Sequence, residues 1–358
     1  MLDERRRSLL PQTEELRSRR KKGGGDPAEA RALRDEIKRL DQELAGIDAE
    51  IEELLAALPN LPDPSVPDGH SEEDAEIIRE VGTPPEFDFE PRDHLELGTA
   101  LGVIDMESAA RASGSRFAYL KGDLVRVELA LVQLAFAVLE PEGFTPVVPP
   151  VLVREEPLFW TGFLPTDRAQ IYEVAGDDLF LVGTSEVSLA ALHADDLLAE
   201  SDLPLRYGGL STCFRREAGA AGRDTRGIFR VHQFDKVEMF SFVRPEESTA
   251  EHELILSIEE RLLQALEIPY RVVNIPAGDL GAPAAKKYDL EAWLPGQGRY
   301  RAEGSKSPRP VHTLNGTAVA VGRTIVAIME NCQRADGGVD VPRVLREHGA
   351  PDEVRPRR

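Results

Sequence analysis

The sequence predicts an α+β fold, with a mixed, mainly antiparallel β-sheet flanked by helices and an N-terminal antiparallel coiled-coil arm. Strand-like and helical segments do not alternate regularly along residues 93–358, which favours α+β over a doubly wound sheet. A heptad pattern within residues 1–58 indicates the arm, and residues 59–92 have the composition of a linker. The chain contains neither a P-loop nor a Rossmann glycine pattern, so any nucleotide site must be built differently.

The arm is predicted to be a helical hairpin. Asp26 and Pro27 signal a helix start, after which apolar residues recur at alternating spacings of four and three. The stripe comprises Leu33, Ile37, Leu40, Leu44, Ile47, Ile51, Leu54 and Leu58. Such a stripe packs against a second helix, which Leu2, Leu9 and Leu16 supply. Because the chain folds back at 23–25, we expect the end of the stripe, from Ile51 to Leu58, to lack partners from the first helix.

Basic residues gather just before the predicted turn of the arm. They are Arg17, Arg19, Arg20, Lys21 and Lys22. The net charge of −21 argues against general nucleic-acid binding, so an RNA partner would need a local basic patch such as this one. Taken without any family, a dimerising or scaffold coiled coil with a solvated charged face is the better interpretation of the arm.

The remaining elements follow in order. Pro59–Glu90, rich in proline and acidic residues, is predicted to be an extended linker. Gly143–Val153 has the Val and Pro pattern of an edge or interface strand. Helices are expected over Asp123–Leu139 and Glu251–Leu266, and strands over Phe180–Val182, Arg271–Ile275 and Tyr288–Leu294.

Composition limits the class of protein. The 358 residues are enough for one large domain plus an appendage. No long apolar run occurs and charged residues begin at Asp3, so we expect neither a membrane span nor a secretory signal, and a cytosolic protein. Cys213 and Cys332 lack the spacing of a zinc site or a disulfide framework, which predicts free thiols and no structural metal.

The most informative segment is Phe214–Glu217, followed by Arg230–Phe234 and Glu238. Two short strands joined by residues 218–227 would form an antiparallel hairpin whose side chains face one ligand. Arginine offers a planar fork of donors to a phosphate, a carboxylate accepts from an amino group, and an aromatic ring stacks on a base. The hairpin therefore predicts a nucleotide site.

This hairpin resembles motif 2 of class II aminoacyl-tRNA synthetases, in the form found in seryl-tRNA synthetases. Thr184–Glu186 is similar to the serine-binding Thr-x-Glu element of that family, and Thr313–Thr317 leading to Arg323 resembles its motif 3. Gly143–Pro150 is similar to motif 1, which forms the dimer interface in the family. The resemblance implies a homodimeric serine–tRNA ligase that uses ATP and Mg²⁺, and it reverses the preference for a scaffold arm.

The resemblance also implies roles for individual residues. Arg215 would hold the α-phosphate and the substrate carboxylate, and Arg323 the γ-phosphate, as the catalytic residues. The implied ATP-binding set is Arg215, Arg216, Glu217, Val231, Phe234, Glu291 and Arg323. The implied serine-binding set is Thr184, Ser185, Glu186, Glu238, Asn315 and Thr317. Glu291 would also bind Mg²⁺. The basic end of the arm would contact tRNA(Ser), with tRNA(Sec) a further candidate, and Pro150 would mark the dimer interface.

The chain departs from the family in several places. It is shorter at the N-terminus, in the first helix, and in the connection Arg301–Pro310 before the motif 3 strand. A real deletion there would weaken ATP binding and leave that strand without a sheet neighbour. Flexible residues that this sequence omits would explain the departures together, and we prefer that explanation. Two other functions stay open, namely an amino-acid-activating ligase that loads a carrier instead of tRNA, and a non-catalytic synthetase paralogue.

Overall fold

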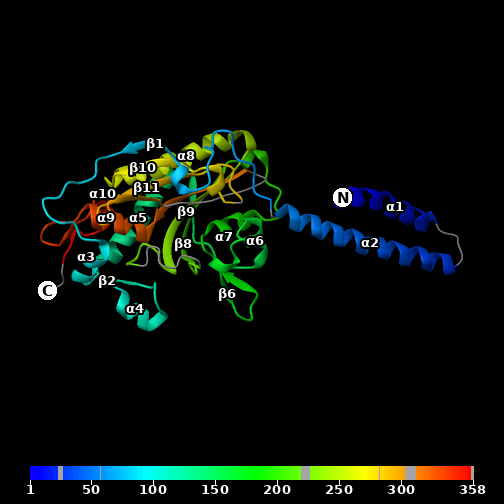
Figure 1. Ribbon diagram of the computed structural model, residues 1–358, viewed down its shortest axis with the longest axis horizontal. Helices are drawn as coiled ribbons and strands as arrows, with labels where there is room; N and C mark the ends of the chain where they lie inside the picture. The colour runs from blue at the N-terminus through cyan, green and yellow to red at the C-terminus, as the bar shows by residue number, and fades with distance from the viewer. Residues whose placement is uncertain (23–26, 57, 219–225, 282, 303–311, 356–358) are drawn as a thin grey trace. The chain divides into compact units, whose positions relative to one another are not determined.

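The computed structural model describes residues 1–22, 27–56, 58–218, 226–281, 283–302 and 312–355 (Figure 1). The chain divides into two compact units, residues 1–59 and residues 60–358. The first unit is the predicted arm and the second is the body that carries the candidate site.

The arm is an antiparallel pair of helices, α1 (Leu2–Lys22) and α2 (Pro27–Ala56). Its buried seam contains Leu9, Leu40, Leu44 and Ile47. Ion pairs border the seam, including Arg5 with Glu43 and Arg17 with Asp41 at 2.8 Å. The coiled-coil prediction is confirmed.

The end of the apolar stripe is less buried than its middle. Leu54 and Leu58 are 57% and 65% exposed, as expected of residues that the first helix does not reach. Ile51 is partly buried and packs against the cluster of the seam. The first helix also continues through Pro11, which sequence reasoning did not consider.

The body contains two four-stranded sheets. The first has the order β1 (Glu76–Val81), β10 (Tyr270–Asn274), β11 (Tyr288–Leu294) and β12 (Arg299–Ala302), all antiparallel. The second has the order β13 (His312–Ala320), β9 (Gln233–Val243), β8 (Leu205–Phe214) and β4 (Phe144–Val147). Only its β4–β8 pair is parallel. The predicted α+β class and the mixed, mainly antiparallel pairing are confirmed.

Helices cover these sheets. α5 (Asp123–Leu139) contacts α9 (Val321–Asn331), α8 (Ser248–Ala265) packs on β13, and α9 packs on β11. Their apolar faces share one core with the sheets, because residues such as Leu131, Ile258 and Ile325 are completely buried. The remaining helices are α3 (His94–Ala100), α4 (Met106–Ser113), α6 (Glu155–Trp160), α7 (Glu186–Ala190) and α10 (Arg343–Glu347). The remaining short strands are β2 (Ile104–Asp105), β3 (Tyr119–Leu120), β5 (Leu152–Val153), β6 (Tyr172–Val174), β7 (Leu179–Leu181), β14 (Val339–Asp340) and β15 (Glu353–Val354).

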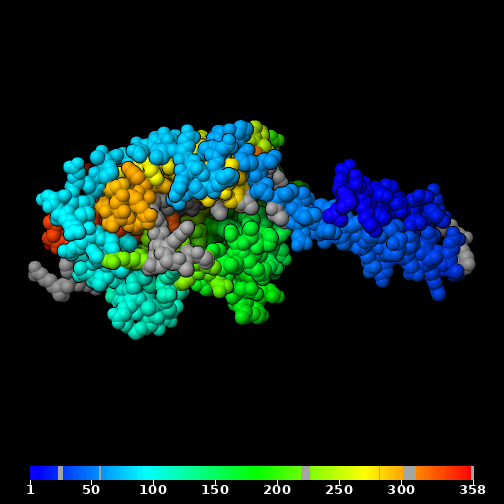
Figure 2. Space-filling model, viewed as in Figure 1, coloured from blue at the N-terminus to red at the C-terminus, as the bar shows by residue number. Residues whose placement is uncertain are grey.

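The segment predicted to be a linker belongs in part to the body. Its residues 76–81 form β1, which pairs antiparallel with β10 at the edge of the first sheet. Figure 2 shows this part of the chain, in light blue and cyan, along the surface of the body. Proline and charge suggested a spacer, but an exposed edge strand tolerates the same composition, because one side of it faces solvent.

Two general expectations can be compared with the structure. Cys213 and Cys332 are free, and burial raises the pKa of both thiols, to about 11 for Cys332. Among the described residues, no helix is both long enough and apolar enough to span a membrane.

Candidate active site

The hairpin that suggested a nucleotide site is larger than expected. β8 and β9 are long strands that end at Phe214 and begin at Gln233, respectively, so Arg215 and Glu217 lie beyond the regular ladder. The prediction of two short strands carrying these residues was wrong. Pairing nevertheless continues, because the amide of Arg215 donates to the carbonyl of His232 at 3.0 Å. The charged side chains therefore sit at the mouth of the hairpin.

A small cavity at this mouth gathers most of the predicted ATP-binding residues. It is lined by Arg215, Glu217, Ile228, Phe229, Arg230, Val231, Phe234, Lys236, Ala320, Gly322 and Arg323. The cavity has a volume of about 40 Å³, which is enough for only one or a few water molecules. It must therefore widen to admit a nucleotide. Motif 2 and motif 3 residues, more than 80 positions apart in sequence, meet here. We call this cavity the nucleotide pocket.

Both predicted catalytic arginines are held in place by backbone and ring contacts. Arg215 donates from Nε to the carbonyl of Gly183 at 3.0 Å, and its guanidinium lies 5.3 Å from the ring centroid of Phe234. Arg323 donates to the carbonyl of Phe229 at 3.4 Å and lies 4.8 Å from that ring. Each arginine is thus anchored through Nε, and a guanidinium can bind a phosphate through two nitrogens at once.

Glu217 stands opposite Arg230, a residue of the predicted hairpin to which the resemblance assigns no role. Arg230 Nε lies 3.3 Å from Glu217 Oε2. Glu217 has a φ of 51°, an uncommon value for a non-glycine residue, and backbone strain of this kind often marks ligand sites. Arg216 is exposed and does not line the nucleotide pocket, unlike the other motif 2 residues of the predicted set.

Three of the predicted serine-binding residues, Thr184, Glu238 and Asn315, are linked in one network through Lys236. Lys236 donates to Thr184 Oγ1 at 2.8 Å and pairs with Glu238, which accepts from Asn315 Nδ2 at 3.0 Å. Glu238 is completely buried. A carboxylate accepts hydrogen bonds from N–H and O–H groups, so Glu238 is suited to a substrate ammonium or hydroxyl. The network therefore brings the Thr-x-Glu element and motif 3 together.

Two hydroxyls beside this network are buried and have no hydrogen-bond partner among the described residues. They belong to Ser185 and Thr317, and Thr317 pairs with Glu238 across the strands. Asn315 and Thr317 also line a cavity of about 450 Å³ bordered by α8, β11 and residues 60–65. Glu186, at the start of α7, is buried and its amide donates to Thr184 Oγ1 at 3.3 Å. A buried hydroxyl without a hydrogen-bond partner can form a hydrogen bond with a small polar substrate.

The carboxylate predicted to bind Mg²⁺ lies on β11. Glu291 is buried and pairs with Arg271. Asp289, two residues away and thus on the same face, pairs with Lys287 at 3.0 Å, and its Oδ1 atom is buried without a hydrogen-bond partner among the described residues. Burial raises the pKa of Asp289, against the opposing charge of Lys287. Carboxylate oxygens of this kind fit the hard ligands that Mg²⁺ prefers.

Sequence reasoning missed Lys236, which links the two halves of the serine-side network. The sequence did contain a signal for Lys236. Phe234, Lys236 and Glu238 lie at alternate positions and so on one face of β9, and roles had been predicted for Phe234 and Glu238.

His232 was interpreted as structural, and its Nδ1 atom lies 2.8 Å from the carbonyl of Arg215. The basic residues of the arm all lie in the last turns of α1, where Arg17 pairs with Asp41 and Arg19 approaches Glu29 at 4.0 Å.

The fold and this site define a class II aminoacyl-tRNA synthetase. Residues 171–332 match the family model described as the tRNA synthetase class II core domain (G, H, P, S and T). The serine–tRNA ligase of Acidothermus cellulolyticus is 49% identical over 387 residues, which cover 99% of this chain and 92% of the relative. That of Streptomyces coelicolor is 50% identical, covering 98% and 91%.

A solved structure agrees with these relatives. The seryl-tRNA synthetase from Pyrococcus horikoshii complexed with ATP has a TM-score of 0.91 and 41% identity to this chain, covering 100% of it and 92% of that chain. This chain belongs to the serine–tRNA ligase family. The predicted family, fold class and enzyme class are confirmed. The aligned stretch of 387 residues exceeds the 358 residues present here, so the relative holds internal residues that this chain lacks.

Proposed function

We propose that the chain activates L-serine with ATP and transfers the seryl group to tRNA(Ser). A serine carboxylate oxygen attacks the α-phosphorus, the bond to pyrophosphate breaks, and seryl-adenylate results. A terminal hydroxyl of tRNA then attacks the acyl carbon, and AMP leaves. The observation that carries this proposal is the meeting of the serine-side network with the nucleotide pocket at Lys236, which contributes to both.

The chemistry needs charge neutralisation more than acid–base catalysis. Nucleotidyl transfer depends on holding the reactants in line and on stabilising charge that develops on the phosphate oxygens. Arg215 lies beside Gly183, next to Thr184, which supports a position between the two substrates. Arg323 lies in the same pocket and fits the far end of the triphosphate. Glu217 and Val231 are assigned to adenine, and Phe234 to stacking on it.

Serine is selected by its polar groups. We assign the ammonium and hydroxyl to Glu186, Glu238 and Thr317, with Thr184, Ser185 and Asn315 completing the pocket. A site that binds a hydroxyl rejects the analogue lacking it by roughly 10⁴ to 10⁵. Alanine should therefore be a very poor substrate.

Magnesium is part of the proposal. Glu291 would hold it, with Asp289 on the same strand face and its unpaired oxygen beside it. When bound, Mg²⁺ neutralises phosphate charge and orients the leaving pyrophosphate. Arg271 holds the carboxylate of Glu291 in place, and Lys287 holds that of Asp289.

A homodimer and a cytoplasmic site of action belong to the same proposal. β4 lies at a sheet edge, and near it the apolar side chains of Val125, Leu129 and Val148 are 38%, 61% and 82% exposed. Exposed apolar side chains at a sheet edge and on a helix that contacts this edge strand support a subunit interface near Pro150. The basic end of α1 is assigned to the tRNA backbone.

The direct test of transfer is charging of tRNA(Ser) with radiolabelled serine. We expect ATP-dependent charging of tRNA(Ser) and none of a tRNA for another amino acid. Charging of a carrier protein instead would favour the carrier-loading alternative. Absence of both, with a folded protein, would favour a non-catalytic paralogue.

A further inference from the structure

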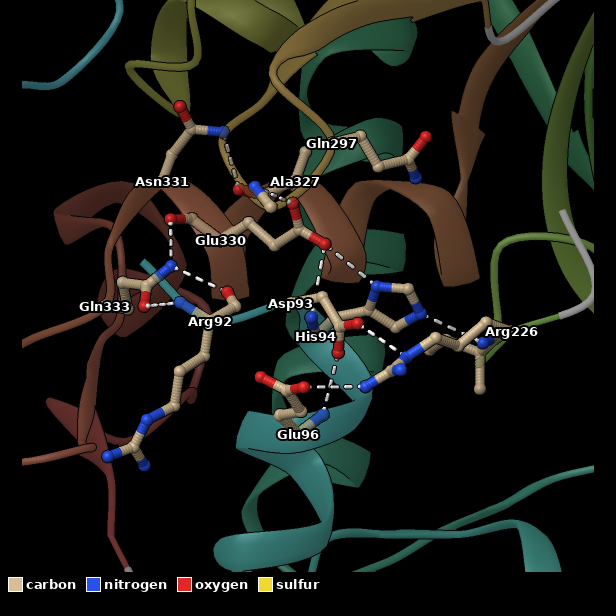
Figure 3. A network of polar contacts seen from close by, with 12 residues as sticks. Arg92, Asp93, His94, Glu96, Arg226, Gln297, Ala327, Glu330, Asn331 and Gln333 are labelled. Carbon is tan, nitrogen blue, oxygen red and sulfur yellow. Dashed lines mark hydrogen bonds and ion pairs between the residues drawn. The ribbon is translucent and has the colours of Figure 1, made fainter. Parts of the chain in front are cut away.

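A buried polar network behind the nucleotide pocket connects three separate parts of the body (Figure 3). Its centre is His94, at the start of α3, which is 3% exposed. His94 Nδ1 lies 2.9 Å from Oε1 of Glu330, a completely buried residue of α9. On the other side, the backbone amide of Ile228 donates to His94 Nε2 at 3.1 Å. The imidazole of His94 thus links α9 to the segment around Ile228, which precedes β9.

The contacts fix the form of the imidazole. A backbone N–H can only donate, so Nε2 of His94 must be the acceptor and carry no proton. Nδ1 then carries the proton and donates it to the carboxylate of Glu330. Glu330 is held in turn, since it also accepts from the amides of His94 at 3.1 Å and of Gly296 at 2.8 Å. The ring has a defined orientation.

The segment held by His94 forms a wall of the nucleotide pocket. Ile228 and Phe229 both line that pocket, and Phe229 contacts Arg323 through its carbonyl and its ring. Arg323 and Glu330 are both on α9, two helical turns apart and therefore on the same side. The same helix thus holds residues 228–229 at two points, directly through Arg323 and indirectly through Glu330 and His94.

Neighbouring contacts show that residues 226–229 pack closely against the start of α3. Arg226 pairs with Asp93 at 2.6 Å and Glu96 at 2.7 Å, in the first turn of α3. Gly227 has a φ of +70°, and a Cβ there would lie 2.0 Å from His94 Nε2. A side chain at this position is excluded, so the backbone can rest directly against the imidazole.

We propose that His94 is a positioning residue of the nucleotide pocket, which holds Ile228 and Phe229 against Arg323 through a hydrogen bond relayed from Glu330. This inference rests on the proposed function for its ligand, ATP. His94 touches no substrate. It holds Ile228 and Phe229 in place, and these residues form the wall of the pocket that contacts Arg323 and would contact adenine.

The test compares variants that remove one hydrogen bond at a time. His94→Asn keeps a donor near Nδ1 and loses the acceptor for Ile228, whereas His94→Gln can place an amide oxygen near Nε2. Gln333→Ala is the matched control. Gln333 lies two residues beyond α9 and bonds the backbone of Arg92 at 2.8 and 3.0 Å and the carbonyl of Glu330 at 2.9 Å, without touching residues 226–229. ATP binding is measured by calorimetry, amide exchange by mass spectrometry, and stability by thermal melting.

We expect His94→Asn to weaken ATP binding about tenfold, the size of one lost buried hydrogen bond, and to speed amide exchange at 226–229. His94→Gln should restore most of the affinity. Gln333→Ala should lower the melting temperature and leave both readouts unchanged. Equal loss of ATP affinity in His94→Asn and Gln333→Ala, or unchanged exchange at 226–229 in His94→Asn, would overturn the proposal. If the unaltered protein binds no ATP, the proposed function fails, and the exchange data alone decide whether His94 anchors this segment.

Discussion

Among single residues, Arg323 gives the sharpest test of the site. Its Nε atom donates to the carbonyl of Phe229, its guanidinium lies 4.8 Å from the ring of Phe229, and it lines the nucleotide pocket. Lysine keeps the charge but loses the planar fork, so Arg323→Lys should lower the rate of adenylate formation by roughly 100-fold. Steady-state pyrophosphate exchange measures this. Arg111→Lys, at an exposed pair with Glu107, is the control and should change nothing. A normal rate for Arg323→Lys would contradict the assignment.

His252 predicts how stability depends on pH. Burial lowers its pKa from 6.5 to about 4, helped by the charge of Lys286. The folded state keeps His252 neutral while the unfolded chain takes up a proton near pH 6.5. The free energy of unfolding is therefore unaffected above about pH 7, and it falls by up to about 3 kcal/mol as pH drops from 6.5 to 4.

His252→Asn should remove that part of the acid sensitivity. Denaturant unfolding at pH 7 and pH 4.5 measures the difference, with His70→Asn as an exposed control. Equal acid sensitivity of the His252→Asn variant and the unaltered protein would show that His252 is not held neutral.

The grouping of the site residues was predictable where a motif named them. Arg215, Glu217, Val231, Phe234 and Arg323 meet in one pocket, as their motifs implied. Lys236 was missed because no motif lists it, although strand alternation placed it between two assigned residues. His94 and Glu330 could not be predicted, since nothing in the sequence shows that positions 236 residues apart share a hydrogen bond.

At the scale of elements, the contribution of the arm to tRNA binding can be tested separately from serine activation. Arg17 and Arg19 have acidic neighbours on α2, so Arg20, Lys21 and Lys22 are the better candidates for tRNA contacts. Reversing these three charges to Glu should reduce charging of tRNA(Ser) by tenfold or more at physiological salt, because phosphate contacts dominate such binding. Serine-dependent pyrophosphate exchange by the same variant is the control and should be unchanged. Unimpaired charging would remove the arm from the tRNA interface.

Element types were easier to predict than their pairing. The heptad stripe and the helices α5 and α8 follow from periodicity, which is a local property. β1 was taken for linker because its pairing with β10 lies about 190 residues away in sequence. The motif 3 strand β13 has a sheet neighbour, because it pairs antiparallel with β9 along its length, so the expectation that it would lack one was wrong. Much of Arg301–Pro310 lies outside the described residues.

For the whole molecule, the proposed dimer can be tested at α5. Leu129→Glu places a charge at an exposed apolar residue of α5 near the proposed interface, and burying that charge between subunits would be costly. Light scattering should give about twice 39.5 kDa for the unaltered protein and about 39.5 kDa for the variant. Leu197→Glu, at a fully exposed leucine, is the matched control and should remain dimeric. A dimeric Leu129→Glu variant would place the interface elsewhere.

The central claim is serine activation, and amino-acid-dependent ATP–pyrophosphate exchange tests it most directly. The assay compares serine, threonine, alanine and glycine, without tRNA, so that it isolates adenylate formation from the arm. The structure predicts exchange with serine and very little with alanine, because alanine would leave the hydroxyl of Thr317 and the carboxylate of Glu238 without the substrate hydroxyl. No exchange with any amino acid, from a protein shown to be folded and dimeric, would contradict the account.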